Sequence, residues 1–180
     1  MLGCRVRQFF SRLLLLGALV LSVFLGLGIV TTPQASATIR QLEEAPGQVV
    51  YQSRETLKDQ QENTWQAIAF KRILPNGKTS LELRLVGFPG MVEIDHTQPL
   101  LLTNSMGKTL TAADISSRIF TDPTNSESNV AQYDLQPLLT QLQVEIPLKL
   151  TLPTRGGEAI NLSVPPSFVQ EWQTLFSSKD

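Results

Sequence analysis

Residues 64–86 read TWQAIAFKRILPNGKTSLELRLV and predict a β-hairpin. Aromatic and β-branched residues between Trp65 and Leu74 favour a first strand. Pro75-Asn76-Gly77 is typical of a tight turn. Beyond the turn, three leucines alternate with Glu82 and Arg84, which is the period of a strand that buries one face and exposes the other. The hairpin therefore predicts a mostly antiparallel sheet.

Further strands are expected on both sides of this hairpin. Residues 38–47, which include Glu43 and Glu44, predict an irregular arm before the first of them. Arg155-Gly156-Gly157 predicts the turn of a second hairpin. The expected strands span residues 49–53, 91–94, 100–103, 108–111, 146–152 and 160–164.

Three helices complete the predicted fold. Residues 112–120 carry apolar side chains at helical spacing, and Asp134 is a candidate cap for a second helix. The third follows Pro165-Pro166-Ser167 and carries a broad apolar stripe formed by Phe168, Val169, Trp172, Leu175 and Phe176. We therefore expect an α+β fold: a mostly antiparallel sheet built from hairpins, two short helices, and a C-terminal amphipathic helix packed on the sheet, forming a single domain over residues 48–180.

The N-terminal 37 residues predict a signal peptide. Three arginines and no acidic residue precede an apolar run over residues 13–30, and Ala35-Ser36-Ala37 follows. Small side chains at Ala35 and Ala37 suit signal peptidase, so cleavage is expected after Ala37. The alternative is an uncleaved anchor, because an apolar run of this length reaches the lower limit for spanning a bilayer. Either reading places the domain on the exported side of a membrane.

The composition of residues 38–180 excludes several classes of protein. The single cysteine, Cys4, lies in the signal, so thiol chemistry, disulfides and thiolate metal sites are excluded from the mature chain. Without the three signal arginines, 12 basic residues face 16 acidic ones, which gives a net charge of −4. This mildly acidic charge argues against nucleic acid as a partner and against strong membrane binding after cleavage.

Candidate catalytic residues are few. His96 is the only histidine, and its neighbour Asp95 would point to the opposite face of a strand, so a catalytic His96 would need a distant carboxylate. Glu93 and Asp95 would share a strand face, which would allow two carboxylates to act together. The alternative for this segment is a solvated strand end without chemistry. Asp134 is a further possible acid or base.

Oxygen-rich side chains gather in residues 122–129. Asp122, Asn125 and Glu127 are candidate ligands for a hard cation such as calcium. The spacing lacks the glycine and the terminal glutamate of an EF-hand loop, so a solvated loop is the simpler interpretation. No cofactor is predicted, because Gly156-Gly157 lacks the flanking residues of a phosphate-binding loop.

Phe88-Pro89-Gly90-Met91 is an apolar stretch in a predicted loop. Exposed Phe88 and Met91 side chains would suit a partner surface. The alternative is a loop that folds back over the core.

Five stretches spread over the mature domain carry a resemblance to a known family: Val49 to Arg54, Thr64 to Ala67, Leu83 to Gly90, Gln132 to Pro137, and Val164 to Ser167. In these stretches the chain resembles a cyanobacterial family of exported proteins known as domain of unknown function 3122. The resemblance implies a periplasmic or thylakoid-lumen setting, and it implies no reaction, ligand or catalytic residue.

Two hypotheses of function follow. The favoured one is a non-enzymatic accessory or binding protein on the exported side, with a membrane protein complex as its possible partner and Phe88 and Met91 in the contact. The alternative is a carboxylate-dependent hydrolase or lyase that uses Asp95, His96 or Glu93.

Overall fold

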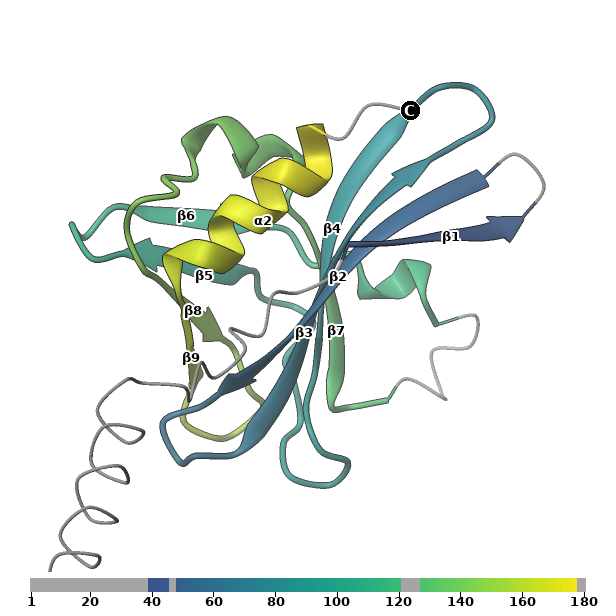
Figure 1. The fold of residues 1–180 in the computed structure, drawn as a ribbon. Coiled ribbons are helices and arrows are strands. Elements are labelled where there is room, and N and C mark those ends of the chain that lie inside the picture. Colours follow the sequence, from purple (N-terminus) through teal and green to yellow (C-terminus); the bar gives the residue numbers. More distant parts are fainter. Residues whose placement is uncertain (1–38, 46–47, 121–126, 178–180) are drawn as a thin grey trace, which may run out of the picture. The chain divides into compact units, whose positions relative to one another are not determined.

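A computed structural model of the chain describes residues 39–45, 48–120 and 127–177 (Figure 1). All of these residues lie in the compact unit Ala37–Asp180. The predicted signal peptide, residues 1–37, lies outside them, so its cleavage stays a prediction. No helix in the described part of the chain is both long enough and apolar enough to cross a membrane.

The larger sheet has five antiparallel strands and contains the predicted hairpin. Its order is β1-β2-β3-β4-β7. Strands β3 and β4 pair from Gln66↔Val86 to Ile73↔Thr79, and the intervening turn places Gly77 at a φ of 76°. The strands are β1 (Arg40–Ala45), β2 (Gln48–Lys58), β3 (Thr64–Ile73), β4 (Thr79–Val86) and β7 (Val130–Asp134).

Two features of this sheet differ from the sequence prediction. The stretch expected as an irregular arm contains β1, which pairs with β2 between Arg40↔Gln52 and Ala45↔Gln48. Strand β7 was not predicted, and it pairs with β4 at the opposite edge. Both strands lie at edges and are fixed by partners rather than by a strong pattern of their own.

The smaller sheet has four antiparallel strands in the order β6-β5-β8-β9. Strands β8 and β9 form the second predicted hairpin, with register Leu150↔Leu162 at its centre. The strands are β5 (Leu100–Asn104), β6 (Thr109–Ala112), β8 (Leu148–Leu152) and β9 (Ile160–Val164). The predicted strand over residues 91–94 is wrong: only Ile94 makes a β-bridge there, to Thr154.

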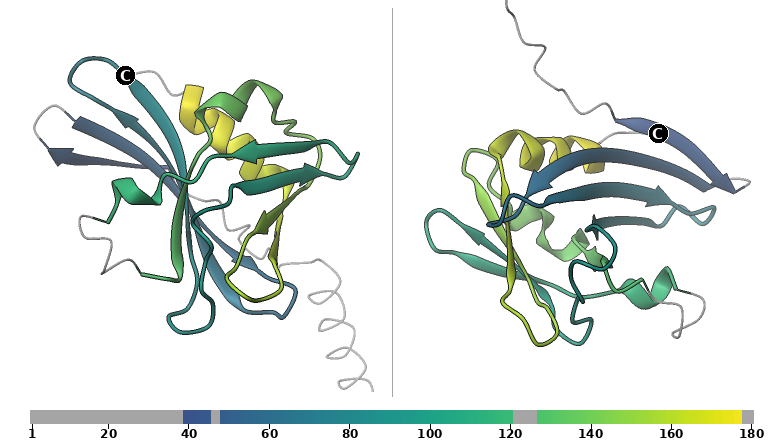
Figure 2. Two further views of the ribbon diagram at one scale, coloured as in Figure 1. Left: turned by 180° about the vertical axis from the view of Figure 1, so that it is seen from behind. Right: turned by 90° about the horizontal axis from the view of Figure 1, so that it is seen from below.

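The C-terminal helix α2 (Pro166–Ser177) is confirmed, and it packs against β2 and β3. Its Val169, Trp172 and Leu175 side chains are buried in a core cluster that also contains residues from both sheets. Figure 2 shows the sheets and the helix from two further directions. The helix therefore joins the two sheets through one continuous apolar core.

The two shorter helices are 3-10 turns. Residues 112–120 form only η1 (Ser116–Arg118), because the backbone before it pairs with β7: Asp114 bridges Tyr133, and Ile115 N donates to the carbonyl of Gln132 at 2.8 Å. The second is η3 (Gln136–Gln141), whose N-cap is Leu135 and not the predicted Asp134, although Asp134 Oδ1 accepts from Gln136 N at 3.0 Å. The described residues thus form nine strands, two 3-10 turns and α2, which is an α+β arrangement with less helix than predicted.

A pair of carboxyl groups links β2 to α2 and gives the fold a pH dependence. Burial, the charge of Glu171 and a hydrogen bond with Glu171 raise the pKa of Glu55 to about 7. Because the folded state favours the protonated carboxyl, its contribution to stability is full below the ordinary pKa of 4.5 and is lost as the pH rises through about 7.

We therefore expect the melting temperature to fall across this interval, and Glu55→Gln to flatten the profile. Thermal melting followed by circular dichroism at a series of pH values measures this dependence of the melting temperature on pH. Glu158→Gln, at an exposed position, is the control and should keep the wild-type slope. An unchanged slope in Glu55→Gln would show that another group controls the pH dependence.

Candidate functional site

The loop after β4 begins at a rigid base. Gly87 N donates to the carbonyl of Asn129 at 2.9 Å, and Asn129 Nδ2 donates back to the carbonyl of Gly87 at 2.8 Å. Asn129 is buried, and the ring of Trp65 lies directly against Gly87. These contacts tie the start of the loop to β3 and to the segment before β7.

The Trp65 ring is itself held by a buried carboxylate. Trp65 Nε1 donates to Asp59 Oδ2 at 3.1 Å. Asp59 also accepts from the backbone N of Gln61 and of Asn63, and from Asn63 Nδ2. Burial opposes ionisation of Asp59, but the hydrogen bonds outweigh it and lower the pKa of this carboxyl. The base of the loop therefore rests on a fixed aromatic ring.

The tip of the same loop carries two exposed apolar side chains. Phe88 is 68 % exposed and Met91 is 48 % exposed. Met91 N donates to the carbonyl of Phe88 at 3.3 Å, and Gly90 has a φ of 80°, so the segment turns on itself rather than folding back over the core. Of the two alternatives that the sequence left open, the structure shows exposed side chains, and their role in a partner contact stays a prediction.

A methyl group at Gly87 should destabilise the fold. An added Cβ would lie 2.8 Å from Cη2 and 3.0 Å from Cζ3 of Trp65, whose ring is 2 % exposed and hydrogen-bonded. We expect Gly87→Ala to lower the free energy of unfolding by about 2 kcal/mol, measured by urea denaturation. Gly157→Ala is the control, since its Cβ would meet only the Thr154 hydroxyl, at 3.1 Å. An equal loss in both variants would contradict the proposed clash.

The carboxylates predicted to act together have separate roles. Asp95 lies in a turn, where Oδ1 accepts from the N and Oγ1 of Thr97, and Oδ2 accepts from Gln98 Nε2. Hydrogen bonds from Thr97 lower the pKa of Asp95. Glu93 instead lies 3.5 Å from Arg155 Nη1, an exposed ion pair. Asp95 is therefore held in its charged form, the opposite of what a shared-proton pair requires.

His96 has the distant carboxylate that the sequence could not identify. Its Nδ1 lies 3.1 Å from Oδ2 of Asp114, whose Oδ1 accepts from Ser116 N at 2.8 Å. The ring meets Phe120 edge-on with centroids 6.3 Å apart, and Nε2 is buried with no hydrogen-bond partner in the described part of the chain. Asp114 therefore orients His96 as a carboxylate orients a general base, but Nε2 contacts no hydroxyl or other reacting group among the described residues.

The predicted cation loop lies largely outside the described residues, since these include neither Asp122 nor Asn125. Glu127 is described and is exposed. Across residues 39–45, 48–120 and 127–177, no three histidine, cysteine, aspartate or glutamate side chains group closely enough to hold a metal ion.

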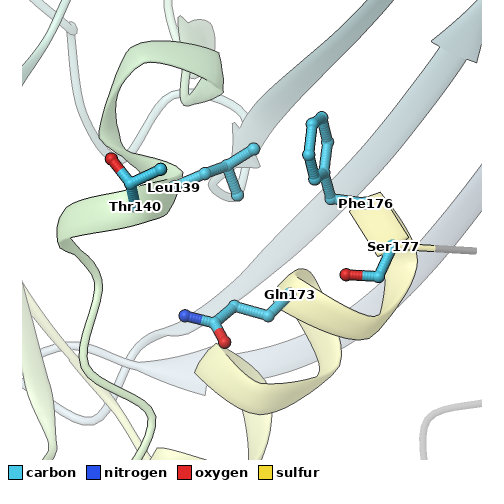
Figure 3. A pocket seen from close by; sticks show the side chains of 5 residues that line it. All are labelled: Leu139, Thr140, Gln173, Phe176 and Ser177. Atoms are coloured by element: carbon cyan, nitrogen blue, oxygen red, sulfur yellow. The ribbon is translucent and has the colours of Figure 1, made fainter.

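A groove of about 270 Å³ lies between η3 and α2. Figure 3 shows side chains of η3 on one side of it and side chains of α2 on the other. Gln173 is fixed there by donating from Nε2 to the carbonyl of Leu142 at 2.9 Å. The described lining is uncharged and therefore suits a neutral group better than an ion: Leu139, Thr140, Gln173, Phe176 and Ser177.

A family model described as protein of unknown function (DUF3122) matches residues 37–175. The chain belongs to this family. No curated protein and no solved structure matches it. The matched range includes both sheets and most of α2, so the fold described above is that of a DUF3122 domain.

The DUF3122 domain also contains a buried polar network that sequence reasoning missed. Glu82 is 2 % exposed and accepts from Arg72 Nη1 at 3.1 Å and from Gln132 Nε2 at 2.7 Å. Arg84 donates from Nε and Nη2 to Gln132 Oε1 at 3.0 and 2.8 Å. The alternation of Glu82 and Arg84 with leucines predicted a solvated face. The available signal was that Arg72 falls on the same face of β3 as Phe70, and the unpredicted strand β7 supplies Gln132.

Proposed function

We propose that this protein is an exported accessory protein that docks onto a membrane protein complex through Phe88 and Met91. The observation that carries the proposal is the exposure of both side chains at the tip of a loop with a fixed base. A small number of apolar and aromatic side chains commonly supply most of the energy of a protein contact. The predicted signal peptide supports a location in the periplasm or thylakoid lumen.

The rigid base of the loop favours binding. A loop that is already ordered loses little conformational entropy when it binds, so more of the contact energy appears as affinity. Here the hydrogen bonds between Gly87 and Asn129, and the packing of Gly87 on Trp65, order the loop before a partner arrives. Phe88 and Met91 therefore present an apolar surface in a defined position.

The test is co-migration on native gels. Membranes from the producing cell are gently solubilised, and the full chain is located by mass spectrometry together with its N-terminus. We expect it to migrate with a large membrane complex and to begin at Thr38. Combining Phe88→Ser with Met91→Ser should release it to the size of the free protein without lowering its melting temperature, because both side chains are exposed.

Met106→Ser is the matched control. Met106 is 77 % exposed in the turn between β5 and β6, so its replacement removes a comparable apolar side chain from another part of the surface. This variant should remain with the complex. Wild-type chain that migrates alone, or a double variant that stays bound, would contradict the proposal.

A hydrolase or lyase is the alternative function, and the orientation of His96 by Asp114 favours it. The separate partners of Glu93 and Asp95 argue against a reaction that needs two cooperating carboxylates. Hydrolysis of a panel of activated esters and glycosides by the wild-type chain, abolished in His96→Ala, would support this alternative. Equal rates in the two proteins would remove it.

A further inference from the structure

Two glutamate side chains meet where α2 packs on β2. The carboxyl groups of Glu55 and Glu171 lie within hydrogen-bonding distance of each other. In the described part of the chain neither glutamate forms an ion pair with a lysine, an arginine or His96. Lys71, on the same face of the sheet, has its ammonium over the ring of Phe176, 6.0 Å from the centroid. Two ionised carboxylates in contact repel each other, so the pair lacks a positive group.

A buried hydroxyl lies on the same side of β2. Ser53 is two positions from Glu55, so both side chains point to the face of the sheet on which α2 packs. Ser53 is 1 % exposed, and its Oγ is buried and makes no hydrogen bond with the described residues. A buried polar atom without a partner is costly, so this hydroxyl favours a bound ion or water beside the carboxyl pair.

One oxygen of each carboxyl group is in the same condition. Oε1 of Glu55 and Oε1 of Glu171 are buried and accept no hydrogen bond from the described residues. The neighbouring strand offers no polar side chain, because Ala67 and Ala69 of β3 pair with Glu55 and Ser53. Three oxygen atoms between β2 and α2 are therefore left for a ligand from outside the chain.

The chemistry of these atoms favours a divalent cation. All three are hard oxygen ligands, and two of them belong to carboxylates. Calcium usually takes about six to eight oxygen ligands, whereas magnesium is commonly held by one or two carboxylates and keeps several of its waters. Glu55 and Glu171 are only half-buried, so such waters have access to the pair. Magnesium is therefore the better match.

We propose that Glu55, Glu171 and Ser53 bind a magnesium ion between β2 and α2. The ion replaces the proton that the two carboxyl groups otherwise share, and the Ser53 hydroxyl oxygen is its third protein ligand. Because the ligands come from both elements, bound magnesium stabilises the packing of α2 on the sheet. The site shares no residue with the loop that carries Phe88 and Met91, the docking loop, so its test is independent of the proposed function.

The test is a calorimetric titration of the full-length chain, purified in a non-ionic detergent, with magnesium chloride at constant ionic strength. The pH is about 8, above the pKa of about 7 of Glu55, so that a proton competes less with the ion. We expect saturable binding that Glu171→Gln weakens by about tenfold, the effect of losing one charged interaction. Ser53→Ala should weaken it to a smaller extent, because the lost ligand is uncharged.

Thermal melting gives a second readout that does not depend on calorimetry. Magnesium should raise the melting temperature of the wild type, because it binds the folded state, and the rise should be smaller in Glu171→Gln. Without magnesium this variant should melt no lower than the wild type, since glutamine removes a like charge from the pair. Loss of folding therefore does not complicate the comparison.

Glu158→Gln and Glu127→Gln are the matched controls, because each removes one exposed carboxylate from another part of the surface. Both should keep the wild-type dissociation constant. Glu127 belongs to the segment that the sequence predicts as a cation loop, so its variant separates the two sites. Four results would overturn the proposal: no saturable binding beyond that of sodium chloride, an unchanged dissociation constant in Glu171→Gln, equal weakening in Glu127→Gln, or tighter binding of calcium than of magnesium.

Discussion

Replacing Trp172 by alanine should lower the free energy of unfolding by about 4 kcal/mol, the largest effect that we expect from a single substitution. Trp172 is 1 % exposed and lies on α2 in the core cluster shared by the two sheets. Alanine would leave a large cavity in this cluster, which joins α2 to both sheets. Urea denaturation followed by far-ultraviolet circular dichroism measures the loss.

The matched control is Gln170→Ala on the exposed side of the same helix. This change should alter the free energy of unfolding by less than about 0.5 kcal/mol, as is usual for a surface position. A loss below about 1 kcal/mol in Trp172→Ala would mean that α2 contributes little to the core, contrary to its burial. The remaining tryptophan, Trp65, reports by fluorescence whether the β3 region unfolds together with the helix.

The second large effect is expected from Asp59→Ala, with a loss of about 3 kcal/mol in the free energy of unfolding. The carboxylate accepts from Trp65 Nε1 and from the backbone N of Gln61 and Asn63, at 3.1, 2.9 and 2.9 Å. Alanine would leave the indole donor buried without a partner and would release the turn before β3. Because Trp65 packs on Gly87, the base of the docking loop should loosen as well.

This loss should depend on pH. The pKa of Asp59 is lower in the folded state than its ordinary value of 3.8, so its contribution to stability is present above that value and disappears as the pH falls through the lower one. The difference in the free energy of unfolding between wild type and Asp59→Ala should therefore become smaller at acidic pH, as measured by urea denaturation at several pH values. Asp95→Ala is the control, because Asp95 accepts similar hydrogen bonds in a turn that is open to solvent. It should lower the free energy of unfolding by less than Asp59→Ala does. A difference in the free energy of unfolding that stays constant down to strongly acidic pH would show that the charged form of Asp59 is not the source of the stabilisation.

Local patterns were sufficient where a structural element is specified by neighbouring residues. The hairpin of β3 and β4 follows from leucine alternation and a Pro-Asn-Gly turn, and α2 follows from an apolar stripe behind two prolines. Phe88 and Met91 were identified as apolar residues in a loop without the period of a buried element, although only the structure shows that both are exposed.

Local patterns failed where a distant partner decides the structure. Residues 112–120 have helical spacing, but the bridge between Asp114 and Tyr133 takes up the backbone and leaves only a short turn. His96 has its carboxylate partner 18 positions away, and neither residue is in a pattern that would associate them. Edge strands such as β1 likewise form because they pair with a neighbouring strand of the sheet, here β2.

By itself the sequence determined the two hairpins and the amphipathic C-terminal helix, because these depend on turns and periodicities within about 25 residues of chain. Only the tertiary structure decided the placement of β7 and therefore the buried contact between Glu82 and Gln132, 50 positions apart. Charges that alternate along one strand look solvated until a neighbouring strand brings them partners, and that pairing has no local signal.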